Sequence, residues 1–181
     1  FKHALVRDAL YQSLLSEARS TLHAKIGKEI ERRGGNRLPE VAEILAYHYS
    51  RTNMADKAFA YLLMAGSKAL DVYSLDEATT HLTAALALLE QHPTCASDNE
   101  FAKFFVAYSS LLSLSGRWKT SIDTLERHFP RIDRLGDDPS VLLIRVPYVL
   151  ALAFNARYRD AAAAQRKTLE MAHRLGDSKS K

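Results

Sequence analysis

Gly116-Arg117-Trp118-Lys119-Thr120-Ser121 ends one run of small and apolar residues and opens another. Similar polar-aromatic phrases open Ala-rich stretches at three other places: Asn53-Met54-Ala55-Asp56-Lys57-Ala58, Ser74-Leu75-Asp76-Glu77-Ala78 and Ala156-Arg157-Tyr158-Arg159-Asp160-Ala161. The phrases recur with a period of roughly 20 or 40 residues, and no strand-like alternation lies between them. This pattern is typical of stacked helical hairpins, in which each hairpin buries its apolar face against its neighbours. We therefore expect an all-α fold that builds a binding surface rather than a catalytic pocket.

The spacing of apolar residues predicts about nine helices and no sheet. Leu22, Ile26 and Ile30 recur every fourth residue in a helix that starts near Ser16 and ends at Gly34. Later helices are expected, approximately, at residues 39–52, 55–73, 76–91, 99–115, 118–135, 139–155 and 159–175. The phrase Arg-Leu-Gly-Asp occurs at residues 134–137 and again at 174–177, where it should stop two helices at matching places of a true repeat.

The composition is that of a globular protein, with 181 residues of which 47% are hydrophobic and 25% charged. A net charge of +4 is mild for this length, so we do not expect nucleic acid as a partner. No apolar run approaches the ~20 residues that cross a bilayer, and no signal peptide is visible, so we expect a cytoplasmic protein without membrane association. The single cysteine, Cys95, has no internal disulfide partner. Because the chain opens on Phe1 without a methionine, we expect it to be part of a larger protein.

The helical pattern resembles the tetratricopeptide repeat, whose motif places small residues where two helices cross closely. Two overlapping registers carry the resemblance: Leu45-Ala46 with Tyr49, Ala58, Leu62 and Ala65, and then Ala65-Gly66 with Ala78, Leu82 and Ala85. Gly116 with Trp118 and Ala156 with Tyr158 mark later turns, although these later units are nearer 40 residues than the 34 of the family. The resemblance implies a right-handed superhelix of stacked antiparallel hairpins over residues 38–177. It also implies that Ala58, Ala65, Ala78 and Ala85 face neighbouring helices, and that Trp118 and Tyr158 are buried in equivalent places.

The N-terminal phrase, residues 1–15, is more specific. Together with Leu22-His23 and Ala46-Tyr47-His48-Tyr49, it resembles the junction of large bacterial signalling ATPases, in which a P-loop ATPase module and a winged helix precede a helical array. Members of that family include class III adenylate/guanylate cyclases and LuxR-type transcription regulators. The resemblance implies that residues 1–37 are a helical junction from the upstream module and that residues 178–181 are a tail.

His3 is a candidate nucleotide sensor by the same resemblance. Phe1-Lys2-His3-Ala4-Leu5-Val6-Arg7 is similar to a Met-His-Asp motif whose histidine reaches the nucleotide phosphate in ATPases of this class. The motif has Asp where this chain has Ala4. The alternative is that His3 only begins an amphipathic helix.

The chain lacks the common catalytic signatures. It contains no G-x-x-x-x-G-K-[ST] loop, no H-E-x-x-H, no C-x-x-C and no G-x-S-x-G, so we expect no catalytic residues, no metal site and no bound cofactor. The histidines are scattered singly, and lone helical histidines such as His48 and His81 are expected to be packing or surface residues. A basic set on the first helix, Arg19, Lys25, Lys28, Arg32 and Arg33, is interleaved with Glu17, Glu29 and Glu31, which favours intrahelical ion pairs.

Three functions fit these features. The first is a protein-interaction and regulatory arm that binds a partner protein or the parent's own ATPase and output domains, with a nucleotide cyclase as the expected output. The second is a small-molecule, inducer-sensing domain of a LuxR-type regulator. The third, nucleic-acid binding, is disfavoured by the interleaved charges. The candidate partner-binding residues are Tyr47, Arg51, Tyr108 and Phe154.

Overall fold

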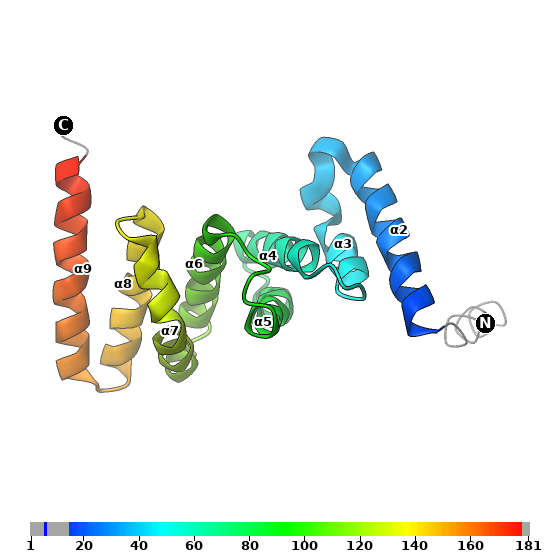
Figure 1. Cartoon of the computed structure of the whole chain (residues 1–181). Coiled ribbons are helices and arrows are strands. Elements are labelled where there is room, and N and C mark those ends of the chain that lie inside the picture. The colour runs from blue at the N-terminus through cyan, green and yellow to red at the C-terminus, as the bar shows by residue number, and fades with distance from the viewer. Residues whose placement is uncertain (1–5, 7–14, 179–181) are drawn as a thin grey trace.

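The computed structural model describes residue 6 and residues 15–178, and over this part of the chain the fold is entirely helical. His3 and the tail residues 179–181 lie outside the described residues. The helices follow one another in a row from α2 to α9 (Figure 1). They are α2 (Ser16–Gly34), α3 (Ala42–Tyr49), α4 (Ala55–Asp71), α5 (Leu75–Gln91), α6 (Asp98–Leu114), α7 (Trp118–Ile132), α8 (Pro139–Phe154) and α9 (Tyr158–Ser178), with short 3-10 helices at Gly35–Val41 and Asp133–Leu135.

Most helix bounds agree with the sequence predictions, and two do not. The predicted helix at 39–52 begins only at Ala42, because Arg37 (φ −101°, ψ 18°) and Val41 (φ −114°, ψ 13°) interrupt helical geometry around the 3-10 segment. The predicted stop at Gly176 is also wrong, since α9 continues to Ser178. At the first copy of the Arg-Leu-Gly-Asp phrase the chain does turn, and Gly136 has a φ of 65°.

Three consecutive hairpins, α4–α5, α6–α7 and α8–α9, share one turn geometry. After each first helix one residue adopts a left-handed conformation, and the next amide donates to a carbonyl five residues earlier, as in a Schellman motif. The left-handed residues are Tyr73 (φ 56°), Gly116 (φ 63°) and Ala156 (φ 57°). The hydrogen bonds are Ser74 N to Ala69 O at 2.8 Å, Arg117 N to Leu112 O at 2.8 Å and Arg157 N to Leu152 O at 2.9 Å. Equivalent positions of the three hairpins can therefore be counted from these turns.

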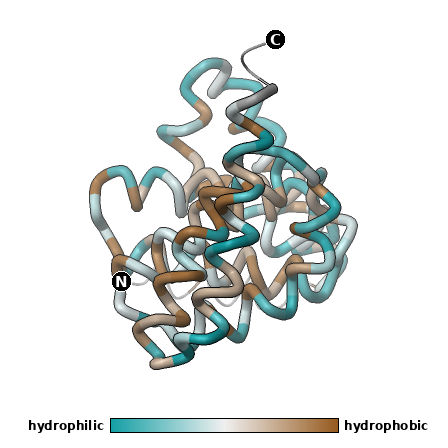
Figure 2. Tube along the Cα trace, turned by 90° about the vertical axis from the view of Figure 1, so that its left-hand side faces the viewer, coloured by the Kyte–Doolittle hydropathy of each residue, from teal (hydrophilic) through white to brown (hydrophobic). Residues whose placement is uncertain are grey.

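Each hairpin packs on the next through its first helix. Helix α6 lies against both α4 and α5, and α8 lies against both α6 and α7. Aromatic side chains fill the space between α4 and α6, where the ring centroids of Phe59 and Phe104 are 5.5 Å apart. Seen from the C-terminal end of the row, apolar segments gather toward the middle of the stack (Figure 2). Burying these rings supplies much of the driving force that holds the hairpins together.

Small residues stand where the helices cross closely, as predicted. Ala58, Ala65, Ala78 and Ala85 are at most 1% exposed. Gly66 is also buried, and a Cβ atom built on it would lie 2.5 Å from Cγ of Leu82 on α5. Because real Cβ atoms do not approach so closely, α4 and α5 can pack at this distance only with a glycine at this position.

A polar cluster joins α2 to the hairpins. Glu31 on α2 accepts hydrogen bonds from Lys57 Nζ (2.6 and 2.8 Å) and from the Tyr61 hydroxyl (2.7 Å), both on α4. Burial alone would raise the pKa of Glu31, but the hydrogen bonds from Lys57 and Tyr61 lower it overall. Nearby, Gly27 lies under the Tyr49 ring, which a Cβ atom at that position would approach to 2.9 Å. Helix α2 is thus held by one close contact and one paired, half-buried carboxylate.

Candidate functional site: an apolar groove across the first helices

The first helices of the three hairpins present equivalent residues to one groove. Residues at 2, 6, 10 and 13 positions before each left-handed turn residue share one helical face. On α4 these are Asp71, Ser67, Leu63 and Ala60, on α6 Leu114, Ser110, Val106 and Lys103, and on α8 Phe154, Leu150, Val146 and Leu143. All four residues of α4, all four of α6 and Leu143 of α8 line the groove. The repeat therefore produces a shared surface by placing the same face of each first helix side by side.

The groove has a volume of about 900 Å³ and mostly apolar walls. Besides the residues counted above, it is lined by Met64, Leu70, Tyr73, Glu100, Ala107 and Ser140. The same face continues along α8 as an exposed apolar row that we call the α8 stripe: Leu143, Val146, Leu150 and Phe154, which are between 47% and 67% exposed. Four large apolar side chains exposed in one helical row are unusual on a surface that contacts only water.

Few polar groups interrupt the groove, and they are not arranged for catalysis. Lys103 and Asp71 are exposed. Glu100 is already engaged, because its carboxylate accepts hydrogen bonds from the Ser97 amide (3.0 Å) and hydroxyl (2.6 Å) in the capping box of α6. The Ser110 hydroxyl donates to the Val106 carbonyl at 2.9 Å. The lining thus offers apolar contact area, one cation and one anion.

The candidate residue Phe154 lies on the α8 stripe, with 67% of its surface exposed. One face of its ring stacks on Trp118, with centroids 4.6 Å apart and planes inclined by 13°. The candidate Tyr108 belongs elsewhere. It is 3% exposed and stacks on Phe104 inside the core, so a role for Tyr108 in surface binding does not agree with the structure. The sequence could not distinguish the two rings, because both lie on amphipathic helices and only their neighbours differ.

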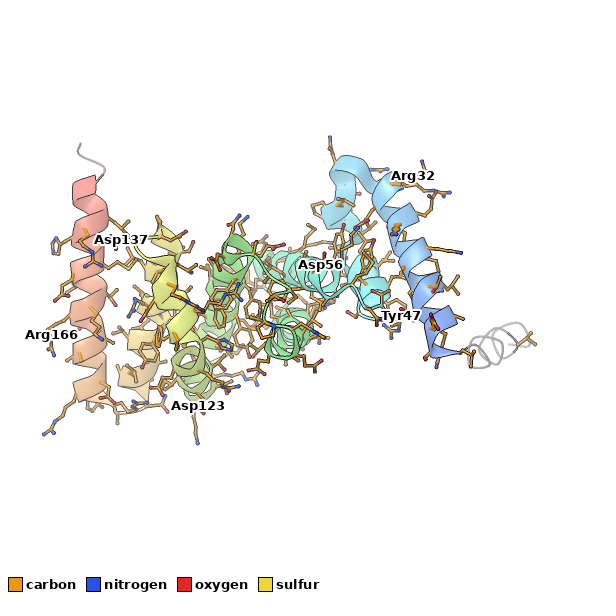
Figure 3. All side chains as sticks on the ribbon, in the orientation of Figure 1. Arg32, Tyr47, Asp56, Asp123, Asp137 and Arg166 are labelled. Atoms are coloured by element: carbon orange, nitrogen blue, oxygen red, sulfur yellow. The ribbon has the colours of Figure 1, made fainter. Side chains whose placement is uncertain are left out.

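Tyr47, another candidate, lies at the α2–α3 end of the row (Figure 3), and the remaining candidate, Arg51, contacts it there. The Arg51 guanidinium lies 3.7 Å from the Tyr47 ring centroid, and its Nη1 donates to the Tyr47 carbonyl at 2.9 Å. Neither residue lines the groove. The structure therefore brings Tyr47 and Arg51 together but does not bring them to Phe154.

Two histidines expected to be single are in fact paired. Nδ1 of His23 on α2 lies 2.9 Å from Nδ1 of His48 on α3, so one ring donates a proton and the other accepts it. Burial lowers the pKa of both histidines, the positive charge of Arg51 lowers both further, and repulsion from His48 adds to the lowering at His23. The sequence spacing of 25 residues gave no signal of this contact.

The expectation that Trp118 and Tyr158 occupy equivalent buried places is wrong for Tyr158. The two residues are equivalent in the chain, each lying two positions after its left-handed turn residue. Trp118 is half-buried because Phe154 of the next hairpin covers it, whereas Tyr158 is 69% exposed. Burial at this position therefore depends on the presence of a following hairpin.

Two of the basic residues of α2 pair with an acid on the same helix. Arg32 and Arg33 both pair with Glu29 on the same helix, at 2.7 and 2.6 Å, which confirms the predicted intrahelical pairing for these two. Glu31 instead pairs with Lys57 of another helix.

Within residues 15–178, no group of three or more His, Cys, Asp or Glu side chains is arranged to hold a metal ion. No described helix combines the length and apolarity that a membrane span requires.

The comparisons with known proteins give no match: no family model, no curated protein and no solved structure is similar enough to this chain.

Proposed function

We propose that this chain is a non-catalytic protein-interaction and regulatory arm, arranged as a divergent tetratricopeptide-repeat-like superhelix, within a multidomain bacterial signal-transduction ATPase. Its parent's output would be a class III nucleotide cyclase, and its partner a protein segment or the parent's own ATPase and output domains. The observation that carries the proposal is the apolar groove formed by equivalent faces of α4, α6 and α8 and continued by the α8 stripe. Its lining favours burial of an apolar segment over any reaction.

The size of the groove suits a peptide segment. Burying a single leucine or phenylalanine contributes about 1.5–3 kcal/mol, so three anchors of a partner contribute at most about 9 kcal/mol. Because association itself costs about 4 kcal/mol or more, three anchors alone support weak binding, with a Kd in the high-micromolar to millimolar range. The Lys103 ammonium and the Asp71 carboxylate would orient such a segment by charge.

A second candidate function, sensing of a small inducer, is supported by the volume of about 900 Å³, which lies within the range of ligand sites.

The test is selection of binding peptides from a displayed random library with the whole chain, followed by affinity measurement by calorimetry. We expect the selected peptides to lose about tenfold or more in affinity to Leu143→Glu and to Leu150→Glu, since each substitution removes an apolar contact and introduces a charge. Both side chains are about half-exposed, so the fold should tolerate the change. Leu22→Glu on α2, which alters a 41% exposed leucine outside the groove, is the matched control.

Peptides that bind Leu143→Glu and Leu150→Glu as tightly as the parent chain would rule out the groove as the interaction site. If peptide selection fails while a library of drug-sized ligands yields binders that are sensitive to the same two substitutions, the inducer-sensing function is supported instead.

A further inference from the structure

Helix α9 differs from the other second helices in the exposure of several equivalent positions. Counted from the turn, Leu82 of α5 and Leu125 of α7 are equivalent, and they are 0% and 1% exposed. The residue at this position of α9 is Gln165, which is exposed. One heptad later, Leu89 and Ile132 are 2% and 0% exposed, whereas the equivalent Ala172 is exposed.

Two further positions show the same change. Ile122 of α7 is 3% exposed and its equivalent Ala162 is exposed, while Phe129 is half-buried and its equivalent Leu169 is 52% exposed. We call Ala162, Gln165, Leu169 and Ala172 the terminal stripe. These residues share one side of α9, since they are spaced by three and four residues.

The change does not extend around the whole helix. Ala78, Ser121 and Ala161 occupy another equivalent position, and all three are buried. What differs is the neighbour: α6 packs on α5 and α8 packs on α7, whereas no described helix follows α9, which lies at the end of the row (Figure 1). Tyr158 fits the same explanation, because Phe154 of the next hairpin covers its equivalent Trp118.

We propose that the terminal stripe and Tyr158 form a stacking site for a further helical hairpin of the same kind. The first helix of that hairpin would lie on α8 and α9 as α8 lies on α6 and α7, continuing an interface that the chain already contains twice. This site is separate from the groove and does not depend on the proposed function.

The residues of the site define the chemistry of the occupant. Ala162 and Ala172 are smaller than the residues they replace, so they leave room for large apolar side chains on the incoming helix. An aromatic ring near the C-terminal end of that helix would stack on Tyr158, as Phe154 stacks on Trp118.

A lengthened chain tests the proposal. Because residues 134–137 and 174–177 have the same sequence, a second copy of residues 138–178 can follow Asp177 in the register that joins α7 to α8. We expect one cooperative unfolding transition with Tm raised by about 4 °C or more, because each stacked interface adds to the stability of its neighbours. Amide hydrogen exchange in the first copy of α9 should slow about tenfold or more.

Leu169→Glu in the first copy should abolish both effects while leaving the unextended chain within about 1 °C of its normal Tm. Ala163→Glu is the matched control and should preserve both effects. Ala163 is exposed, and its equivalents, Thr80 of α5 and Asp123 of α7, remain exposed although a hairpin follows each of those helices. A second extension, with residues 97–137 in place of 138–178, provides an independent hairpin with its own capping box.

The proposal is overturned if both added hairpins melt separately and leave exchange in the first α9 unchanged. It is equally overturned if the unextended chain forms a dimer in sedimentation equilibrium that Leu169→Glu disrupts, because a second copy of the chain would then be the occupant.

Discussion

Gly66 provides the sharpest test of the helix packing. Replacing it with alanine adds a methyl group that would lie 2.5 Å from Cγ and 2.6 Å from Cδ2 of Leu82. Leu82 is fully buried, so its side chain cannot move aside into solvent. Overpacking of this kind costs about 1–3 kcal/mol of stability. Because the added methyl group would overlap two carbon atoms of Leu82, we expect a cost near the upper end of this range.

An opposing contribution reduces this cost. Alanine stabilises a helix interior by about 1 kcal/mol relative to glycine, so Gly66→Ala should lower the free energy of unfolding by about 1–2 kcal/mol. For a chain of this length the corresponding fall in Tm is about 2–8 °C. Gly176→Ala on α9 is the matched control, because no atom lies within 4 Å of the added Cβ, and it should leave stability unchanged or slightly raised.

The assay is urea unfolding followed by circular dichroism, extended to a double-mutant cycle. Leu82→Ala alone should cost about 2–5 kcal/mol, and in the Gly66→Ala background its cost should fall by about 1 kcal/mol or more, because the new methyl fills part of the cavity. If Gly66→Ala stabilises the protein as the control does, or if the two substitutions are additive, the close approach of α4 and α5 is refuted.

Three further predictions concern the turns and the contacts between helices. Ala156→Gly should raise the free energy of unfolding by about 0.5–1 kcal/mol and so shift the urea midpoint upward, because the left-handed conformation at φ 57° disfavours a Cβ atom. A lower midpoint would contradict the turn geometry. Since the folded-state pKa values of His23 and His48 are lowered, the unfolded chain binds more protons below pH ~6.5, so Tm should fall as the pH decreases through this region. His48→Gln should weaken that dependence and His92→Gln, in an exposed connector, should not; equal profiles for all three proteins would argue against the histidine pair. Trp118→Ala should cost about 1–3 kcal/mol in thermal unfolding, less than for a fully buried aromatic, and a cost below about 0.5 kcal/mol would contradict its stacking on Phe154.

The helices themselves could be predicted from the sequence because their causes are local. Four-residue apolar spacing, small residues at the crossings and the repeated turn phrases placed α4 to α9 within a few residues of their observed bounds. The exception at residues 35–41 arose because Pro39 is compatible with the first turn of either an α-helix or a 3-10 helix, and the backbone angles of Arg37 and Val41 decide which forms.

The candidate site could be predicted only in part. Phe154 was identified from its residue type, but Leu143, Val146 and Leu150 were not. Their spacing of three and four residues forms a second apolar row on a helix that already has a buried apolar face, and this row could have indicated an exposed binding surface. The pairing of His23 with His48 had no local signal, because it depends on how α2 lies against α3.

The sequence by itself determined where most of the helices begin and turn, since hydrogen bonds within a helix and left-handed turn residues depend on nearby positions. Only the tertiary structure decided which aromatic and apolar residues remain accessible. Trp118 and Tyr158 have the same local sequence context, yet one is covered and the other is exposed, because burial is a property of the neighbouring hairpin and not of the residue. For the same reason Tyr108 lies in the core, whereas Leu143 and Phe154 face solvent beside the groove.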